Sequence, residues 1–323
     1  MAEKKRKVSI LIASRNARDD LPKLFASLGK ISYPKSMYEV VFVDDGSTDG
    51  SWEIARKFGA RVFRFKERRG RAEARNKALR LAKHPLVAWI DSDCEIADRD
   101  WIQNMMKHIG GKVVGVAGNQ LRPRSGLSRV LWYLPGTAYT AGHPGPASFA
   151  PTTSSLFLKK PLLEVGGFDP KMITAEDLEI CWRLGERGYR FVKTNEAEIY
   201  HNFRSTMTGF ERQQFERGEF GAYLFRKYDR GVLWKKMDKM IFLMPFAGTA
   251  VLLFPSLIWV PVVAPALFHF GLGYVNFFPA VMWNYLKNER SPLGLLQLVA
   301  AEYVKTYATL LGMLAYQIKN LKN

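Results

Sequence analysis

Short apolar runs alternate with amphipathic stretches over the first 120 residues of the chain. The short runs are rich in Val and Ile and predict strands, whereas the longer stretches, with apolar residues three or four positions apart, predict helices. The expected strands are 8–14, 40–43, 61–65, 86–90 and 113–117. The expected helices are 19–28, 51–58, 71–82 and 98–109. This alternation predicts an α/β domain with a mostly parallel sheet and helices on its faces.

The pattern changes after residue 239, because residues 240–286 contain no Asp, Glu, Lys or Arg. A helix that crosses a bilayer needs about 20 apolar residues. The length of the uncharged stretch therefore predicts two spans, near 240–260 and 266–286. The alternative is a buried helical hairpin of a protein without a membrane segment.

A third apolar stretch, near 293–317, is interrupted by Glu302 and Lys305. These residues are three apart, so they can pair on one helical face. We expect a third span with a polar stripe, and the alternative is an amphipathic helix that lies in the membrane interface. The chain is thus predicted to have three parts, at 1–207, 208–236 and 237–323, and the last is a small transmembrane domain of about three helices.

Basic residues flank the first two predicted spans. By the positive-inside rule, they predict an integral membrane protein whose front domain is cytoplasmic. The basic residues concerned are Lys235, Lys236, Lys239, Lys287 and Arg290.

The formal net charge is +18, and residues 237–323 contribute only +3 of it, with six Lys/Arg and three Asp/Glu. A basic front part favours anionic partners, such as a phosphorylated substrate, an anionic membrane surface or nucleic acid. Charge alone does not choose among them. The two cysteines, Cys94 and Cys181, have no zinc spacing and make no disulfide framework, so we expect two small core side chains in a reducing compartment.

Acidic residues follow two of the predicted strands, at the sheet edge where open α/β folds bind ligands. Asp44 and Asp45 open the segment 44–49 after the second strand. Their carboxylates can accept hydrogen bonds from a base or a ribose. The alternative is a turn that caps the helix starting at Ser51.

Asp91 and Asp93 follow the strand expected at 86–90. Carboxylates two positions apart at a strand end point the same way, so they can share a hard cation such as Mg²⁺ or Mn²⁺. The alternative is an acidic turn that leads into the next helix. Glu176 and Asp177 open a later predicted helix, where carboxylates are favoured by the helix dipole or can include a general base.

In this order, these clusters resemble the family 2 inverting glycosyltransferases, whose fold is the GT-A type of α/β domain. The likeness covers residues 8 to about 220, and each motif alone is weak. The segment 209–228 that leads into the apolar region is similar to that of cellulose-synthase-like and dolichyl-phosphate sugar synthases. The matching pieces are Ser14-Arg15-Asn16, Asp44-Asp45-Gly46-Ser47, Ala74-Arg75-Asn76, Asp91-Ser92-Asp93, Gly166-Gly167-Phe168-Asp169, and Glu176-Asp177 with Arg183.

The resemblance implies a role for each matching position. Asp177 is implied to be the catalytic base, with Glu176 beside it. A divalent cation, Mn²⁺ or Mg²⁺, is implied to bind Asp91, Asp93 and His201. The acceptor is implied to contact Gly167, Arg204 and Arg212. The nucleotide sugar is implied to contact Ser14, Arg15, Asp44, Asp45, Arg75, Asp91, Ser92, Gln214 and Arg217.

Gln214, Arg217 and Gly218 resemble the Gln-x-x-Arg-Trp motif of processive polysaccharide synthases, with glycine in place of tryptophan. The missing aromatic ring favours a single transfer over chain extension. The segment 123–153 is longer than an ordinary connection, and we expect it to be a lid or insertion that contacts the acceptor.

The sequence therefore predicts a metal-dependent inverting glycosyltransferase that moves a hexose, mannose from GDP-mannose, onto a dolichyl- or polyprenyl-phosphate-linked acceptor in glycan biosynthesis, such as N-glycan assembly. One alternative is a UDP-sugar-dependent glucosyl- or N-acetylglucosaminyltransferase of the same fold. The other is a catalytically inactive membrane-bound scaffold. A nucleic-acid partner is not expected, because acidic clusters occupy the ligand edge.

Overall fold

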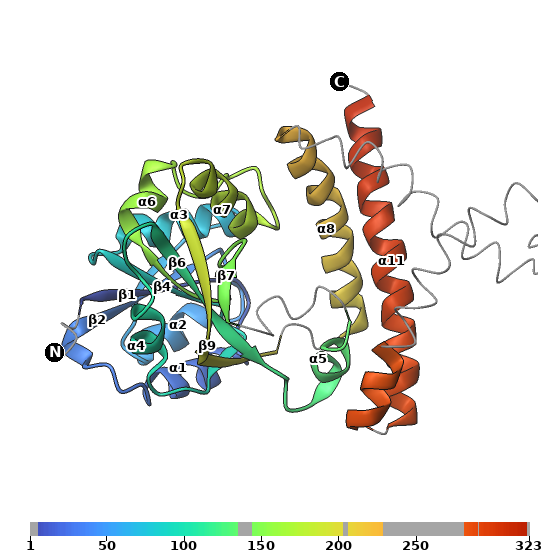
Figure 1. Cartoon of the computed structure of the whole chain (residues 1–323), viewed down its shortest axis with the longest axis horizontal. Helices are drawn as coiled ribbons and strands as arrows, with labels where there is room; N and C mark the ends of the chain where they lie inside the picture. Colours follow the sequence, from blue (N-terminus) through green and yellow to red (C-terminus); the bar gives the residue numbers. More distant parts are fainter. Residues whose placement is uncertain (1–5, 135–143, 203–205, 229–280, 290, 322–323) are drawn as a thin grey trace, which may run out of the picture. The chain divides into compact units, whose positions relative to one another are not determined.

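The computed structural model describes residues 6–134, 144–202, 206–228, 281–289 and 291–321 (Figure 1). The chain divides into two compact units. The first comprises residues 1–124 and 138–203, and the second comprises residues 125–137 and 204–323. The boundaries predicted at 207 and 236 stay predictions.

The described part of the first unit is built on one sheet of nine strands, in which the order β3-β2-β1-β4-β8-β6-β9-β5 is completed by β7 on β9. Parallel pairs join β1 to β2 and β4, β2 to β3, and β6 to β9. Antiparallel pairs join β4 and β6 to β8, and β5 and β7 to β9. The strands are β1 (Val8–Ser14), β2 (Tyr38–Asp44), β3 (Arg61–Arg64), β4 (Leu86–Ile90), β5 (Cys94–Ile96), β6 (Val113–Leu121), β7 (Gly145–Ala147), β8 (Ser154–Leu158) and β9 (Arg190–His201).

Helices cover both faces of this sheet, because alternate residues of its inner strands face opposite sides. In β1, Ile10 and Ile12 join a core cluster with α1, α2 and α4, whereas Leu11 joins a second cluster with α3, α6 and α7. The helices of this unit are α1 (Leu21–Leu28), α2 (Ser51–Lys57), α3 (Arg71–Leu81), α4 (Trp101–Met106), α6 (Lys159–Glu164) and α7 (Glu176–Glu186), with a short 3-10 turn at Lys35–Met37.

The expected α/β class is confirmed, and the five expected strands and four expected helices are present with small shifts at their ends. The sheet is mixed rather than mostly parallel, because β8 runs antiparallel between β4 and β6. A run of apolar residues predicts a buried strand, but it does not specify the partner or the direction of that strand.

The second unit contains α5 (Gly126–Leu131), α8 (Met207–Lys227), a helical stretch at 281–289, and α11 (Pro292–Leu321). An added Cβ at Gly218 of α8 would overlap the carbonyl of Thr309 on α11, and one at Gly312 would overlap the carbonyl of Phe215. The backbones of α8 and α11 therefore approach closely at these two glycines.

The prediction of an integral membrane protein is corrected. Among the residues that the structure describes, no helix is long and apolar enough to cross a bilayer. The expected span near 240–260, and most of that near 266–286, lies outside the described residues. The third, near 293–317, falls on α11, a helix of 30 residues. Its apolar stretch is interrupted by Glu302 and Lys305, whose Oε2 and Nζ atoms pair at 2.9 Å.

We expect the contact between α8 and α11 to depend on the missing side chain of Gly218. Gly218→Ala forces a methyl group against a backbone carbonyl and should lower the free energy of unfolding by about 2 kcal/mol. Gly221, on the same helix, has open space where its Cβ would be. Gly221→Ala is therefore the matched control, and it should be neutral or stabilising by about 0.5 kcal/mol, because alanine favours helix more than glycine does. Chemical denaturation of the two variants measures the difference, and equal effects would contradict the close approach.

Candidate active site

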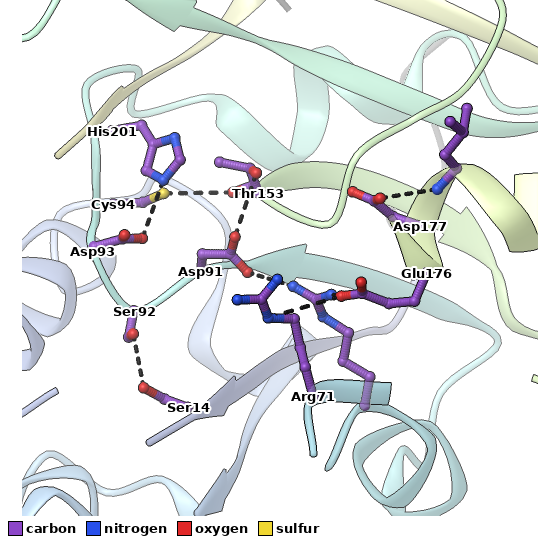
Figure 2. Close-up of polar contacts among 12 residues, drawn as sticks. Ser14, Arg71, Asp91, Ser92, Asp93, Cys94, Thr153, Glu176, Asp177 and His201 are labelled. Atoms are coloured by element: carbon purple, nitrogen blue, oxygen red, sulfur yellow. Dashed lines mark hydrogen bonds and ion pairs between the residues drawn. The ribbon is translucent and has the colours of Figure 1, made fainter. Parts of the chain in front are cut away.

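Three polar segments meet at one edge of the sheet because β1, β2 and β4 are parallel. Ser14 ends β1 and is level with Asp44, which ends β2. Asp91 and Ser92 follow β4, the other neighbour of β1. The Ser14 hydroxyl donates to the Ser92 hydroxyl over 2.8 Å (Figure 2). The sequence therefore placed these residues at a common edge correctly.

Asp44 is fully buried, and one of its oxygens lacks a partner among the residues that the structure describes. Oδ2 accepts from the backbone N–H of Ser47 at 3.0 Å and lies 3.5 Å from Nε of Arg64. Oδ1 has no hydrogen-bond partner among the described residues. A buried carboxylate oxygen without a donor is unfavourable. This oxygen is thus suited to a donor group on a ligand.

The other two aspartates of the segment 44–49, Asp45 and Asp49, accept hydrogen bonds from backbone N–H groups. Asp45 accepts from the backbone N–H groups of Arg69 and Gly70, at 2.6 Å and 3.0 Å, and so fastens the start of α3. Asp49 accepts from the backbone N–H of Ser51 in the first turn of α2 at 3.0 Å. The turn interpretation of this acidic segment therefore applies to Asp45 and Asp49, and contact of Asp44 and Asp45 with a base or a ribose stays a prediction.

Asp91 is held by protein groups on both of its oxygens. Oδ1 accepts from Nη2 of Arg75 at 2.9 Å, and Oδ2 accepts from the Thr153 hydroxyl at 3.3 Å (Figure 2). Asp93 turns to a different partner, since its Oδ1 lies 3.3 Å from Nε2 of His201. The two carboxylates of the motif thus have different surroundings, although they are two positions apart.

Strand pairing brings Asp93 and His201 together. In the antiparallel pair of β5 and β9, Cys94 is level with His201, and the backbone N–H of Asn202 donates to the Asp93 carbonyl at 3.0 Å. Nδ1 of His201 lies 3.3 Å from Nε2 of Gln120, a residue 4% exposed whose Oε1 has no partner among the described residues. If the Gln120 amide is turned by 180°, its Oε1 accepts a hydrogen bond from Nδ1–H of His201. The lone pair on Nε2 of His201 is then available to a metal.

A carboxylate and an imidazole here fit a divalent cation, whereas the adjacent thiol does not. One ligand atom each of Asp93, Cys94 and His201 lie within 4.8 Å of one another. Burial, with the charges of Asp93 and Asp91, raises the pKa of the Cys94 thiol well above its ordinary value. A thiol is in any case a poor ligand for the oxygen-preferring Mg²⁺ and Mn²⁺. Burial and the nearby Asp93 charge also raise the pKa of Asp20, as expected where negative charge gathers.

The two carboxylates that begin α7 differ in exposure. Ala175, just before the helix, has φ +58°, an uncommon conformation for a residue with a side chain. Glu176 is 1% exposed; it accepts from Nη1 of Arg75, and its Oε1 lies 3.9 Å from Nε of Arg71. Asp177 is half-buried, and its Oδ1 accepts from the backbone N–H of Leu178 at 2.9 Å. Asp177 is therefore the more accessible of the pair.

Gly167 belongs to a tightly held turn. It has φ +75°, an added Cβ would overlap Oδ1 of Asn76, and its carbonyl accepts from Nη2 of Arg183 at 2.6 Å. The Asn76 side chain also bonds the backbone N–H and carbonyl of Phe168, at 2.8 Å and 2.7 Å. The structure thus gives Gly167 a packing role, and its predicted contact with an acceptor stays a prediction.

The remaining predicted site residues are on the loop after β1 and in the second unit. Arg15 is an exposed residue of the loop after β1, and Arg204 lies outside the described residues. Three more are on α8 of the second unit. There Gln214 is 3% exposed and accepts from Arg217 at 3.5 Å, and Arg212 pairs with Glu216 at 3.2 Å.

Sequence reasoning missed Thr153, Gln120 and Arg71. Thr153 reaches Asp91 because β8, which begins at the next residue, pairs with β4 so that Ile90 is level with Ser154. No local motif marks such a position, since it depends on which strands pair. Arg71 lies one helical turn before Arg75 on α3, and that spacing was the available signal.

Comparison with known proteins identifies the fold and the family of this domain. Residues 9–166 match the description "Glycosyl transferase family 2". The chain is 27% identical over 191 residues to the glycosyltransferase AglE of Haloferax volcanii, covering 56% of this chain and 62% of that protein. It is 26% identical over 243 residues to the pre-mycofactocin glycosyltransferase of Mycobacterium tuberculosis, covering 70% of this chain and 49% of that protein. The chain thus spans about half to three fifths of the length of these relatives.

A solved structure has the same fold. The mannosyltransferase PcManGT from Pyrobaculum calidifontis, in complex with GDP-Man and Mn²⁺, superposes with a TM-score of 0.60 and 20% sequence identity, over 98% of this chain and 87% of that one. The predicted GT-A fold is confirmed, and residues 9–166 carry the predicted family 2 glycosyl transferase domain, which supports the predicted class of transferase enzyme.

We expect Mn²⁺ to stabilise the protein through Asp93 and His201 and not through Cys94. At a Mn²⁺ concentration about 100 times its Kd, binding adds about 2.7 kcal/mol to the free energy of unfolding. In wild type and Cys94→Ser, Mn²⁺ should therefore raise the Tm, whereas it should not raise the Tm of Asp93→Asn or His201→Ala. Thermal unfolding with and without Mn²⁺ is the measurement, and a rise lost only in Cys94→Ser would overturn the assignment.

Proposed function

We propose that this chain, which carries a glycosyl transferase family 2 domain, transfers a hexose from a nucleoside diphosphate sugar to an acceptor, with a divalent cation and with inversion at the anomeric carbon. The observation that carries the proposal is the pairing of Asp93 with His201, 3.3 Å apart, at the sheet edge that also carries Asp44. This edge offers a cation site and a ligand-directed carboxylate on neighbouring chain segments.

The donor is proposed to lie along this edge. The unpartnered Oδ1 of Asp44 would accept a hydrogen bond from the nucleoside, and Ser14 and Ser92 line the same edge. Asp93 and His201 would hold Mn²⁺ or Mg²⁺, and Asp91, whose oxygens are bonded to Arg75 and Thr153, would orient the donor beside it. A bound divalent cation neutralises the diphosphate and stabilises charge on it as a leaving group.

Asp177 is the proposed base. It lies half-buried in the first turn of α7, whereas the adjacent Glu176 is bonded to Arg75. Asp177 would take the proton of an acceptor hydroxyl as the oxygen attacks the anomeric carbon from the side opposite the diphosphate, which inverts that carbon. If the acceptor atom is a phosphate oxygen, it is already anionic, and Asp177 would position it instead.

We propose GDP-mannose as donor and a dolichyl- or polyprenyl-phosphate-linked acceptor in glycan biosynthesis. The fold shared with PcManGT, a structure in complex with GDP-Man and Mn²⁺, supports the donor. Transfer of one sugar, rather than polymer extension, is supported by Gly218, which packs against the backbone of Thr309 and leaves no room for an aromatic side chain. A UDP-sugar-dependent glucosyl- or N-acetylglucosaminyltransferase, or an inactive scaffold, is the alternative.

The test is release of free nucleotide from a panel of GDP- and UDP-sugars, with Mn²⁺, Mg²⁺ or a chelator, and with or without a polyprenyl phosphate. We expect metal-dependent release from GDP-mannose that the lipid phosphate accelerates. Asp93→Asn should abolish it, whereas Asp100→Asn, which changes an exposed carboxylate that bonds Ser32, should not. Release from a UDP-sugar alone would change the donor assignment, and no release from any donor would favour the scaffold.

With a lipid-linked sugar whose hydroxyl is the acceptor atom, we expect Asp177→Asn to lower kcat by about 10²–10⁴-fold, because it removes the proton acceptor and keeps the shape of the side chain. The donor KM should stay within a few-fold, since the base acts on the acceptor. Glu186→Gln, at the far end of the same helix, is the control. A loss below tenfold would contradict the base role.

A further inference from the structure

One buried guanidinium joins two carboxylates that lie far apart in the sequence. Arg75, on α3, is 4% exposed. It donates through Nη2 to Asp91, which follows β4, at 2.9 Å, and through Nη1 to Glu176, the first residue of α7. Dashed lines at Asp91 and Glu176 in Figure 2 mark these contacts.

We infer that Arg75 is a positioning residue that fixes the first turn of α7, and with it Asp177, relative to the segment 91–93. This inference deepens the proposed function and rests on it. It replaces the contact with the nucleoside that the family resemblance implies for Arg75, because both terminal nitrogens of the guanidinium are already bonded to carboxylates.

The planar guanidinium is suited to this bridge, since its donors form a rigid fork that two carboxylates can occupy at once. The side chains of Arg75 and Glu176 are 5% and 2% exposed, so neither charge is solvated by bulk water. Loss of one member of a buried ion pair leaves the other uncompensated, which is strongly unfavourable. Without Arg75, Asp91 and Glu176 would therefore seek water or new partners, and their segments would move apart.

Further hydrogen bonds connect α3 to the turn that precedes α7. Asn76, the next residue, bonds both backbone groups of Phe168, in the turn that precedes α7. Arg183 of α7 in turn donates to the carbonyls of Val165 and Gly167 in that turn. Adjacent residues of α3 thus hold the helix start and the turn before it. A shift of Arg75 would be transmitted to Asp177 by the backbone that joins it to Glu176.

Arg71 gives Glu176 a second, weaker cationic neighbour. Its Nε lies 3.9 Å from Oε1, and its side chain is 42% exposed. Because it is solvated, Arg71 compensates the Glu176 charge less than Arg75 does and does not reach Asp91 in its place. The bridge between the two carboxylates accordingly depends on Arg75.

The experiment compares Arg75→Gln, Arg75→Lys, Glu176→Gln and the double variant Arg75→Gln/Glu176→Gln in full-length protein, with kcat and donor KM measured at saturating metal. Arg80→Gln is the matched control, because Arg80 is on the same helix, with a side chain 59% exposed and 3.8 Å from Glu73. Circular dichroism and thermal unfolding identify folded variants. If Arg75→Gln does not fold, the comparison of Arg75→Lys with Glu176→Gln takes its place.

Arg75→Gln should lower kcat by about 100-fold, as expected for a displaced catalytic group, with donor KM within about threefold of wild type. Arg75→Lys should recover about tenfold of that loss, because its ammonium keeps the charge without the fork. The kcat of the double variant should be no more than about threefold below that of Arg75→Gln, since the effects of substituting residues that act as a unit are not additive.

A rise in donor KM with kcat unchanged would overturn the inference and restore the nucleoside contact. The inference would also be overturned if the loss of kcat in the double variant equalled the product of the losses in the two single variants. Wild-type protein that releases no nucleotide from any donor marks failure of the proposed function itself. If wild type is active and the two substitutions lower kcat independently of each other, this inference alone has failed.

Discussion

Parallel pairing of β1 with both β2 and β4 is the constraint on which the candidate site depends. Parallel neighbours end at the same edge, so Ser14, Asp44 and the segment 91–93 are neighbours in space although they are dispersed in sequence. The strands hold this register because their alternate residues enter two separate apolar clusters. A one-residue slip would exchange the side chains of the two faces and disrupt the packing of both clusters. Burial of the sheet therefore also fixes the geometry of its polar edge.

Antiparallel strands complete the site from the other side. β8 brings Thr153 to Asp91, and β9 brings His201 to Asp93. These additions give neighbouring carboxylates different surroundings. Asp91 is bonded to an arginine and a hydroxyl, whereas Asp93 faces an imidazole. The difference separates a carboxylate that supports the site from one that is suited to a cation.

The same division recurs at the start of α7. Glu176 is buried and bonded to Arg75, whereas Asp177 is half-buried and bonded to the next backbone amide. In both pairs, a carboxylate held by Arg75 lies close in sequence to one directed elsewhere. The buried guanidinium of Arg75 thus connects both acidic motifs. Removing it would leave the buried carboxylates without a compensating charge, which is unfavourable.

The sequence by itself determined the α/β class, the strand ends that carry Asp44 and Asp91, and the acidic start of α7, because these features depend on local periodicity and on polar residues that follow apolar runs. Tertiary structure decided the mixed direction of the sheet, the partners Thr153 and Gln120, and the turn of Asp93 toward His201, because these depend on which distant strands pair. It also decided that α11, whose apolar pattern had predicted a membrane span, approaches the backbone of α8 closely at Gly312. Periodicity records which face of a helix is apolar, but not what covers that face.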